Sequence, residues 1–419
     1  MQRGQQTLLD LSYDYNRNNS VGTLNGKTGH LSKIINNLNA NKNREYGYDA
    51  LGRLTTAKGG TNNLWTQNYS YDRYGNRTSV TASGVAADNT TIPRDGIANL
   101  AYDTTGNRIT TAGFEYDVAG NQTRALAEDG VSWLKFEYDS ANRLVVVRRD
   151  DGTAIQSFQY GATNARLIAY NLITYLATIY VSNGGTTLAE YTEFGANVPT
   201  WTKSYVYLGD SMLSTVTPNG QGGEFTEFNH PDRLGTRTIT NQQAGTSSEQ
   251  TTLPFGTALD AESTRTNNPK RFTSYDRSAR TGLDYAVNRT YDSKQGRFTS
   301  VDPIGMGASS LASPQTLNLY SYCGNDPINH TDPSGLFWGS LFRTIGKIFN
   351  FVNKVLKWVA IAVAVILIVA VIVYTAGGAM PAFLGNFMGS LLGVLGKIGA
   401  GFSSFMAGAI TASGKSGLS

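Results

Sequence analysis

The chain has 419 residues, of which 46 are glycine, 23 are tyrosine and only 16% are charged. This length is too great for one ordinary core, so we expect two or more structural units. The glycine and tyrosine content favours many turns and aromatic strands over long soluble helices. The single cysteine, Cys323, excludes a disulfide framework or a cysteine-based metal site within one chain.

The net charge of +4 is unevenly distributed. Residues 337–419 contain six basic residues and no Asp, Glu, His or Cys. Subtracting these six charges from +4 leaves −2 for residues 1–336, so the positive balance is no argument for nucleic-acid binding by this larger part. The first residues lack the apolar run of a secretory signal, so we expect export by another route or a start within a longer chain.

The first part of the chain repeats a short phrase that begins with Tyr-Asp. Five copies occur, at residues 48–54, 71–77, 102–108, 116–122 and 138–144. An aromatic residue can end a strand, Asp can cap a turn, and Gly or Asn can take the left-handed position. Each copy therefore predicts a β-hairpin, and we expect the hairpins to stack because one alone cannot bury a face.

The phrase resembles the YD repeat of the Rhs family, which includes bacterial polymorphic toxins and components of insecticidal toxin complexes. Three later stretches, residues 229–235 (Asn-His-Pro-Asp-Arg-Leu-Gly), 296–303 (Gly-Arg-Phe-Thr-Ser-Val-Asp-Pro) and 332–336 (Asp-Pro-Ser-Gly-Leu), extend the resemblance into the Rhs-associated core and the sequence leading to it. The resemblance implies a mainly β fold, with YD-repeat hairpins stacked as part of a shell-like sheet. A helical hydrophobic tail is expected to follow.

Composition and resemblance together predict four segments. Residues 1–165 are expected to form YD-repeat hairpins, and residues 166–252 further strands. Residues 253–336 are expected to form the Rhs-associated core. Residues 337–419 are expected to form a variable hydrophobic tail with one or two transmembrane helices.

Two Asp-Pro-x-Gly sequences, at Asp302 and Asp332, precede the change in composition. Taken alone, both could be ordinary turns. The family core resembles an aspartic autoprotease, and this resemblance implies that Arg289, Asp302 and Asp332 are catalytic and that the chain is cut between Leu336 and Phe337. The residue types suit this chemistry, because two close carboxylates share a proton and a permanently charged guanidinium can stabilise one of them.

Other catalytic chemistry finds no support in the sequence. The His-x-Glu, Cys-x-x-Cys and Gly-x-x-x-x-Gly-Lys patterns are missing, so we expect no cofactor and no metal. His30, His230 and His330 are expected to serve in turns or packing, although His330 could also tune Asp332.

The tail predicts membrane insertion. Residues 337–358 form a basic amphipathic segment that suits a membrane interface. The uncharged run from Trp358 to Tyr374 reaches, with its neighbours, the ~20 residues that a bilayer span needs. A second apolar segment carries small residues at intervals of four, which allow two membrane helices to touch closely; these are Gly385, Gly389 and Gly393. Since acids, His and Cys are missing from the tail, a conventional catalytic cargo is not expected.

We therefore predict the C-terminal part of an Rhs-type polymorphic toxin, whose β shell encloses a cationic membrane-active effector and releases it by single-turnover self-cleavage after Leu336. The tail alone could instead be a plain anchor. For the whole chain the alternatives are a cell-surface adhesion or carbohydrate-binding YD-repeat protein with a membrane anchor, or a remnant without activity. The expected partners are membrane lipid, a cognate immunity protein, and the rest of the shell or a secretion apparatus. We expect secretion or delivery to a cell surface without a signal peptide.

Overall fold

The computed structural model describes residues 2–336, except for positions 4–5, 18–25, 28, 184, 196, 210, 233–234, 266–267, 274 and 306–313. Over this range the protein is mainly β, as predicted, and its helices are short 3-10 turns. In the same range, no helix has the length and apolar character needed to cross a membrane. The predicted helical tail, with Trp358, Tyr374, Gly385, Gly389 and Gly393, lies outside the described residues.

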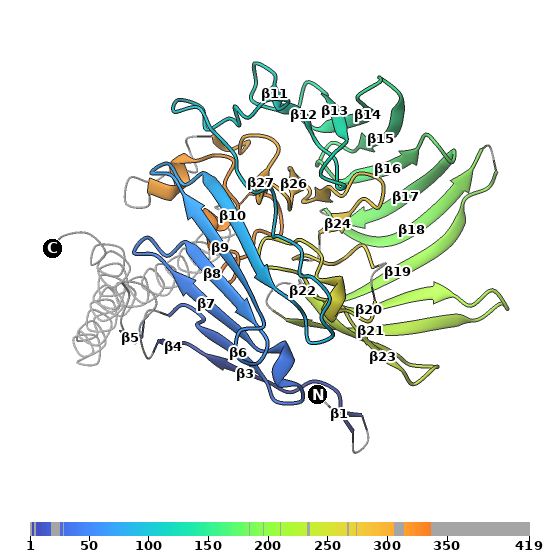
Figure 1. Ribbon diagram of the computed structural model, residues 1–419. Coiled ribbons are helices and arrows are strands. Elements are labelled where there is room, and N and C mark those ends of the chain that lie inside the picture. The colour runs from blue at the N-terminus through green and yellow to red at the C-terminus, as the bar shows by residue number, and fades with distance from the viewer. Residues whose placement is uncertain are drawn as a thin grey trace, which may run out of the picture. The chain divides into compact units, whose positions relative to one another are not determined.

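The N-terminal hairpins form a six-stranded antiparallel sheet in the order β10-β9-β8-β7-β6-β3 (Figure 1). Its strands are β3 (Leu11–Asp14), β6 (Lys33–Asn36), β7 (Arg44–Tyr48), β8 (Leu54–Gly59), β9 (Trp65–Tyr71) and β10 (Arg77–Gly84). Two small ribbons pair β1 (Gln2–Arg3) with β2 (Gln6–Thr7) and β4 (Asn16–Arg17) with β5 (Gly26–Lys27).

A thirteen-stranded sheet follows, in which each strand pairs with the next one along the chain, from β11 to β23 (Figure 1). Its first strands are β11 (Glu115–Tyr116), β12 (Gln122–Leu126), β13 (Trp133–Tyr138), β14 (Leu144–Arg149), β15 (Ala154–Tyr160), β16 (Arg166–Asn171) and β17 (Leu176–Asn183). The others are β18 (Thr186–Phe194), β19 (Thr200–Leu208), β20 (Ser211–Pro218), β21 (Glu224–Asp232), β22 (Gly235–Asn241) and β23 (Ser247–Glu249). The segment boundary expected after residue 165 falls inside this sheet, immediately before β16.

Residues 253–336, here called the core segment, contain a four-stranded sheet and short 3-10 turns. The strands are β24 (Asp276–Arg277), β25 (Asp284–Tyr285), β26 (Thr290–Asp292) and β27 (Arg297–Phe298). The turns are η2 (Asp260–Glu262), η4 (Pro314–Leu317) and η5 (Cys323–Asn325), and a further turn, η1 (Ala40–Lys42), precedes β7.

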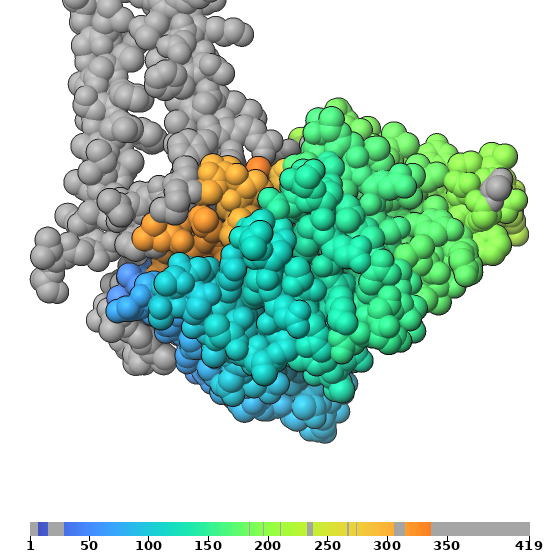
Figure 2. All heavy atoms as spheres, turned by 90° about the horizontal axis from the view of Figure 1, so that it is seen from above, coloured from blue at the N-terminus to red at the C-terminus, as the bar shows by residue number. Residues whose placement is uncertain are grey.

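Hydrogen bonds join the core segment to both large sheets. Arg77 of β10 donates to the carbonyl of Lys294 at 3.0 Å, and Gln122 of β12 donates to the side chain of Gln295 at 2.9 Å. Figure 1 accordingly shows β24, β26 and β27 between the two large sheets. Part of the core segment, drawn in orange in Figure 2, lies beside residues of the repeats drawn in cyan. The core segment therefore packs against sheets that precede it in the chain, and the Arg77–Lys294 contact joins residues 217 positions apart.

The Tyr-Asp phrases form turns as predicted. In the copy at 138–144, the carboxylate of Asp139 accepts the backbone N–H groups of Ala141 and Arg143 at 2.9 and 3.0 Å, while Asn142 takes a φ of 59°. Four copies join paired strands and confirm the predicted hairpins: β7 with β8, β9 with β10, β11 with β12, and β13 with β14.

The copy at residues 102–108 differs from the other four. Its turn is closed by one isolated bridge between Tyr102 and Ile109, and no strand pair is formed. The backbone just before it is already engaged, because Ala98 and Leu100 bond to Val80 and Thr78 of β10.

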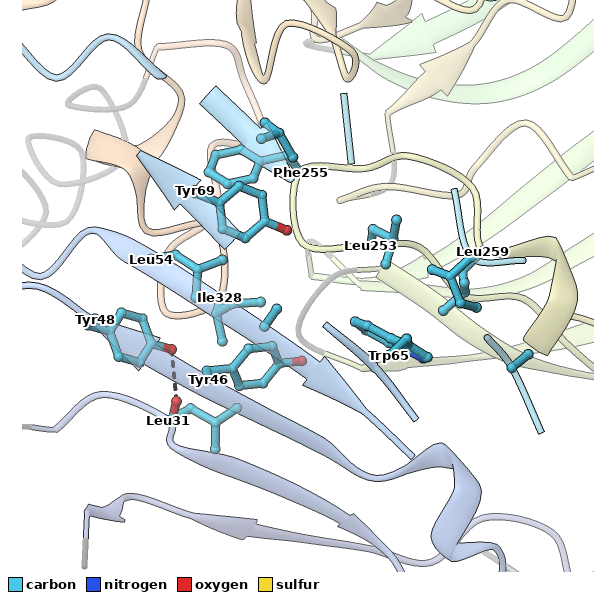
Figure 3. Close-up of a cluster of buried hydrophobic side chains, with 14 residues drawn as sticks. Leu31, Tyr46, Tyr48, Leu54, Trp65, Tyr69, Leu253, Phe255, Leu259 and Ile328 are labelled. Atoms are coloured by element: carbon cyan, nitrogen blue, oxygen red, sulfur yellow. Dashed lines mark hydrogen bonds between the residues drawn. The ribbon is translucent and has the colours of Figure 1, made fainter. Parts of the chain in front are cut away.

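Three clusters of buried hydrophobic residues stabilise these sheets. The first combines the N-terminal sheet with residues of the core segment, and Figure 3 shows Tyr69 beside Phe255, and Tyr48 bonded to the carbonyl of Leu31. The third lies entirely within the core segment and is mostly aromatic; it contains Phe272, Tyr275, Ala286, Tyr291, Phe298, Tyr322 and Cys323. Fully burying side chains of this size contributes about 1.5–3 kcal/mol each.

Candidate self-cleavage site

Arg289, Asp302 and Asp332 come from three parts of the core segment and meet in the structure. Arg289 immediately precedes β26, Asp302 follows β27, and Asp332 follows η5. Nη2 of Arg289 lies 3.2 Å from Oδ2 of Asp302 and 3.4 Å from Oδ2 of Asp332. Because one nitrogen atom contacts both carboxylates, the two acids meet at the same end of a single guanidinium.

The three side chains are almost completely removed from solvent. Their exposed fractions are 1% for Arg289, 6% for Asp302 and 0% for Asp332. Burial raises the pKa of Asp332 above its ordinary value, and Arg289 offsets only part of this rise. Burial likewise lowers the pKa of Arg289, although both carboxylates act in the opposite direction. Desolvation therefore outweighs pairing in its effect on the pKa of Asp332 and on the pKa of Arg289.

Both Asp-Pro-x-Gly sequences do form turns, so the simpler interpretation of these sequences also describes the structure. Asp302 accepts the N–H of Ile304 at its side chain and that of Gly305 at its carbonyl, at 2.9 and 2.8 Å. In the second turn, Gly335 takes a φ of 67°, a left-handed conformation that suits glycine. The turns hold the carboxylates in place, so turn formation and site formation are compatible.

Gly335 and Leu336, the residues just before the predicted cut, contact Arg289 and Asp332. Nε of Arg289 donates to the carbonyl of Gly335, and Oδ1 of Asp332 accepts the N–H of Leu336 at 2.9 Å. Leu336 is half-buried, whereas Phe337 lies outside the described residues. The peptide segment that precedes the predicted cut is thus bound by two of the three predicted residues.

Several neighbours of the site had no strong signal in the sequence. The guanidinium of Arg289 packs 3.6 Å from the ring centre of Phe298, and its Nη1 donates to the carbonyl of Leu319 at 2.9 Å. The hydroxyl of Tyr275 donates to the backbone carbonyl of Asp332. Asn288, next to Arg289, donates to the carbonyl of Ser334. Only chain folding brings these residues together.

The three histidines have partners other than the two acids of the site. His30 and His330 both approach Asp326, with Nε2 to Oδ2 distances of 3.5 and 3.7 Å. His230 pairs with Thr240 at 3.0 Å. Over the part of the chain that the structure describes, no group of three or more His, Cys, Asp or Glu residues could hold a metal ion.

Comparison with known proteins places the chain among those with the same repeats. The family model for the Teneurin YD-shell matches residues 5–181. The tRNA nuclease WapA of Bacillus subtilis is 26% identical over 282 residues, which cover 64% of this chain and 11% of WapA. The tRNA3(Ser)-specific nuclease WapA of Bacillus spizizenii is 30% identical over 137 residues, or 32% of this chain and 6% of that protein. The chain therefore spans about a tenth or less of the curated relatives that it matches.

Solved structures match the fold over most of the chain. The Photorhabdus luminescens Tc holotoxin pore aligns with a TM-score of 0.61 and 18% identity, over 80% of this chain and 17% of the matched chain. The TcdB2–TccC3 protein without its hypervariable C-terminal region aligns with a TM-score of 0.59 and 20% identity, over 79% and 17%.

The fold is that of a YD-repeat protein, in which Tyr-Asp hairpins build large antiparallel sheets around a core segment with buried charges. The family match over residues 5–181 and the WapA relatives support the resemblance to the Rhs/YD-repeat family that the Tyr-Asp phrases indicated.

Proposed function

We propose that this chain is the C-terminal part of an Rhs-type toxin that cuts itself between Leu336 and Phe337 and so frees residues 337–419. One observation carries the proposal: Arg289 contacts both buried carboxylates and, together with Asp332, also binds the peptide that precedes the cut. Binding and chemistry would then occur within one chain, so that proximity replaces capture of a substrate.

The reaction is the hydrolysis of one amide bond. A water molecule adds its oxygen to the carbonyl carbon of Leu336, one carboxylate takes a proton from that water, and the other carboxyl protonates the leaving nitrogen of Phe337. The C–N bond breaks, and a carboxyl group and an amine result. Two acids that differ in protonation suit these two roles.

The electrostatics favour one assignment of these roles. Asp332 is the member whose pKa is raised by burial, so it is the better proton donor. Asp302, which lies nearer to the guanidinium, then acts as the base. Arg289 keeps one carboxylate ionised and lies close enough to stabilise charge that develops at the carbonyl.

The sheets are proposed to form part of a shell around the released tail. The similarity in fold to a Tc holotoxin component supports this proposal, as does the variable C-terminal region named for TcdB2–TccC3. The WapA relatives are named as tRNA nucleases. The tail of this chain lacks the acids, His and Cys that a nuclease needs, so we propose a membrane-active effector instead.

Partners and location follow from this proposal. Membrane lipid would bind the basic, apolar tail, and a cognate immunity protein would protect the producing cell. The rest of a shell or a secretion apparatus would carry the chain out of the cell.

The test of self-cleavage compares wild type with Asp302→Asn. We expect purified wild type to yield a fragment that begins at Phe337, and the variant to remain folded and whole. Asp260→Asn is the matched control, because the Asp260 side chain is 57% exposed and lies outside the site. A wild-type chain that stays whole, or a variant that is cut at the wild-type rate, would refute the proposal. Intact mass and N-terminal sequencing give both results.

A second experiment tests the tail. The released fragment is added to dye-filled vesicles of mixed neutral and anionic lipid. Leakage supports a membrane-permeabilising effector, whereas binding without leakage supports a plain anchor. A fragment that neither binds nor causes leakage contradicts both.

A further inference from the structure

Asn288 holds the segment that precedes the predicted cut. Its side-chain amide donates to the carbonyl of Ser334 at 2.9 Å, and its backbone N–H reaches the same oxygen at 3.2 Å. Two donors from one residue therefore bind the carbonyl of Ser334, two residues before Leu336. No other residue type with a side chain of this length can supply a neutral amide donor here.

The backbone at Asn288 is shaped for this contact. Its N–H also bonds to the carbonyl of Ala286 at 2.7 Å, and Val287 between them takes a φ of 62°. A bond from residue i to i+2 around a positive φ is the rare form of the γ-turn, and a β-branched residue adopts it only when its surroundings impose it. The turn presses against the bound segment, because a Cβ at Gly335 would lie 2.6 Å from the carbonyl of Ala286.

The orientation of the Asn288 amide is set by the large sheet. Asn164, in the turn between β15 and β16, donates its side-chain N–H to Oδ1 of Asn288 at 2.9 Å. Because Oδ1 accepts this bond, the amide nitrogen of Asn288 must face Ser334. Asn164 is itself held, since its carbonyl accepts the hydroxyl of Tyr285 at 2.7 Å. A chain of hydrogen bonds thus runs from the sheet to the bound peptide.

Three consecutive residues of the bound segment each have a separate contact. Asn288 holds the carbonyl of Ser334, Arg289 holds the carbonyl of Gly335, and Asp332 accepts the N–H of Leu336. A shift of one residue would exchange these partners and place a side chain where only Gly335 fits. The contacts therefore define a register.

We propose that Asn288 is a positioning residue that sets which peptide bond is presented to Asp302 and Asp332, and that Asn164 makes this register depend on the folded sheet. The inference rests on the proposed self-cleavage. It adds an order of events, in which cleavage follows the folding of the turn between β15 and β16. The tail is then not released from an incompletely folded protein.

The test uses variants that remove one donor each in the full chain. Asn288→Ala removes the side-chain contact, and Asn288→Asp keeps the acceptor for Asn164 but cannot donate to Ser334. Asn164→Gly removes the distal amide and tolerates the φ of 60° at that position. Asn89→Gly is the matched control, because Asn89 also has a positive φ, of 67°, and is exposed in a turn far from the site in sequence.

We expect about a tenfold slower release of the tail in each of the three variants, which corresponds to the loss of about one hydrogen bond. In the Asn288 variants we also expect fragments with more than one N-terminus, because the register is no longer set. Melting temperatures are measured in parallel, and the control should match wild type in both properties. A purely structural role would lower the melting temperature and leave the position of the cut unchanged.

The double variant Asn164→Gly with Asn288→Ala tests the connection between the two residues. If they act in one chain, the double variant is cut no more slowly than Asn288→Ala alone. Multiplied effects, or single variants that are cut at the wild-type rate and position, would overturn the inference. If the wild type itself stays whole, the proposed self-cleavage fails and the inference fails with it.

Discussion

The hairpin repeats and the core segment use the same residue, aspartate, in opposite ways. In the repeats, Asp139 is partly exposed and accepts neighbouring backbone N–H groups within its own turn. Burial is the largest single influence on its pKa and raises it, but the bonds from Arg143 and the backbone together lower it more, so the net shift is downward. In the core segment, Asp332 is fully buried, and burial raises its pKa despite Arg289.

The comparison teaches that a local turn and a distant pairing place different demands on the fold. A capped turn needs only a few residues with water nearby, so the charge of its aspartate costs little free energy. A buried carboxyl group is costly unless its partners are in place, and it is held by the rest of the structure. The repeats therefore account for the architecture, whereas the core segment holds buried charged groups together at one site.

The largest expected effect comes from breaking the buried ion group. Arg289→Met leaves Asp302 and Asp332 without their shared cation, and the loss of one partner from a buried pair costs about 3–5 kcal/mol. Chemical denaturation of the full chain should show this loss. A cost below about 1 kcal/mol would mean that the two carboxyl groups are not held as charges.

A smaller effect is expected in the repeats. Asp139→Ala removes acceptors for Ala141, Arg143 and the Arg143 side chain, and should destabilise the protein by about 1–3 kcal/mol. Asp139→Asn retains an oxygen for the backbone bonds and should lie between alanine and wild type. Equal stability of the two variants would show that the charge, and not the turn, is what matters.

The pH dependence should differ in sign between the two regions. Asp332 has a raised pKa, so the folded state binds more protons than the unfolded state, and its contribution to stability falls as the pH rises above about 4. Asp139 has a lowered pKa, so its contribution is present above about pH 4 and is lost as the pH falls below that value.

Melting curves across acid and neutral pH, recorded for wild type, Asp332→Asn and Asp139→Asn, measure this difference. As the pH rises, the melting temperature of wild type should fall relative to that of Asp332→Asn. As the pH rises, the melting temperature of wild type should increase relative to that of Asp139→Asn. If the melting temperature depends on pH in the same way for all three proteins, the opposite pKa shifts of Asp332 and Asp139 are contradicted.

The smallest effect is expected at an exposed pair in the repeats. Arg148 of β14 and Glu137 of β13 form an ion pair, and their side chains are 36% and 49% exposed. Glu137→Gln should change stability by less than about 1 kcal/mol, because exposed pairs are screened by water and salt. A larger loss would mean that this exposed pair stabilises the protein as much as the buried group at Arg289 does.

Much of the architecture was predictable because the Tyr-Asp phrases are local. Tyr48, Asp49 and Gly52 lie within one short stretch, and their turn chemistry depends on little else. The copy at residues 102–108 shows the limit, because bonds from Ala98 and Leu100 to another strand leave its turn with a single bridge. The core segment was less predictable, since aromatic clustering around Tyr291 and Phe298 follows no short period.

The sequence determined the hairpins and the mainly β fold, and the family resemblance that it carries singled out Arg289, Asp302 and Asp332 as one group. These three residues do lie together, while their chemistry stays a prediction. Tertiary structure decided what no local pattern encodes: the bond between Asn164 and Asn288, 124 residues apart, and the contact of Arg289 with Gly335. Turn chemistry acts between near neighbours along the chain, whereas the register of a bound peptide depends on atoms that only the complete fold brings within hydrogen-bonding distance.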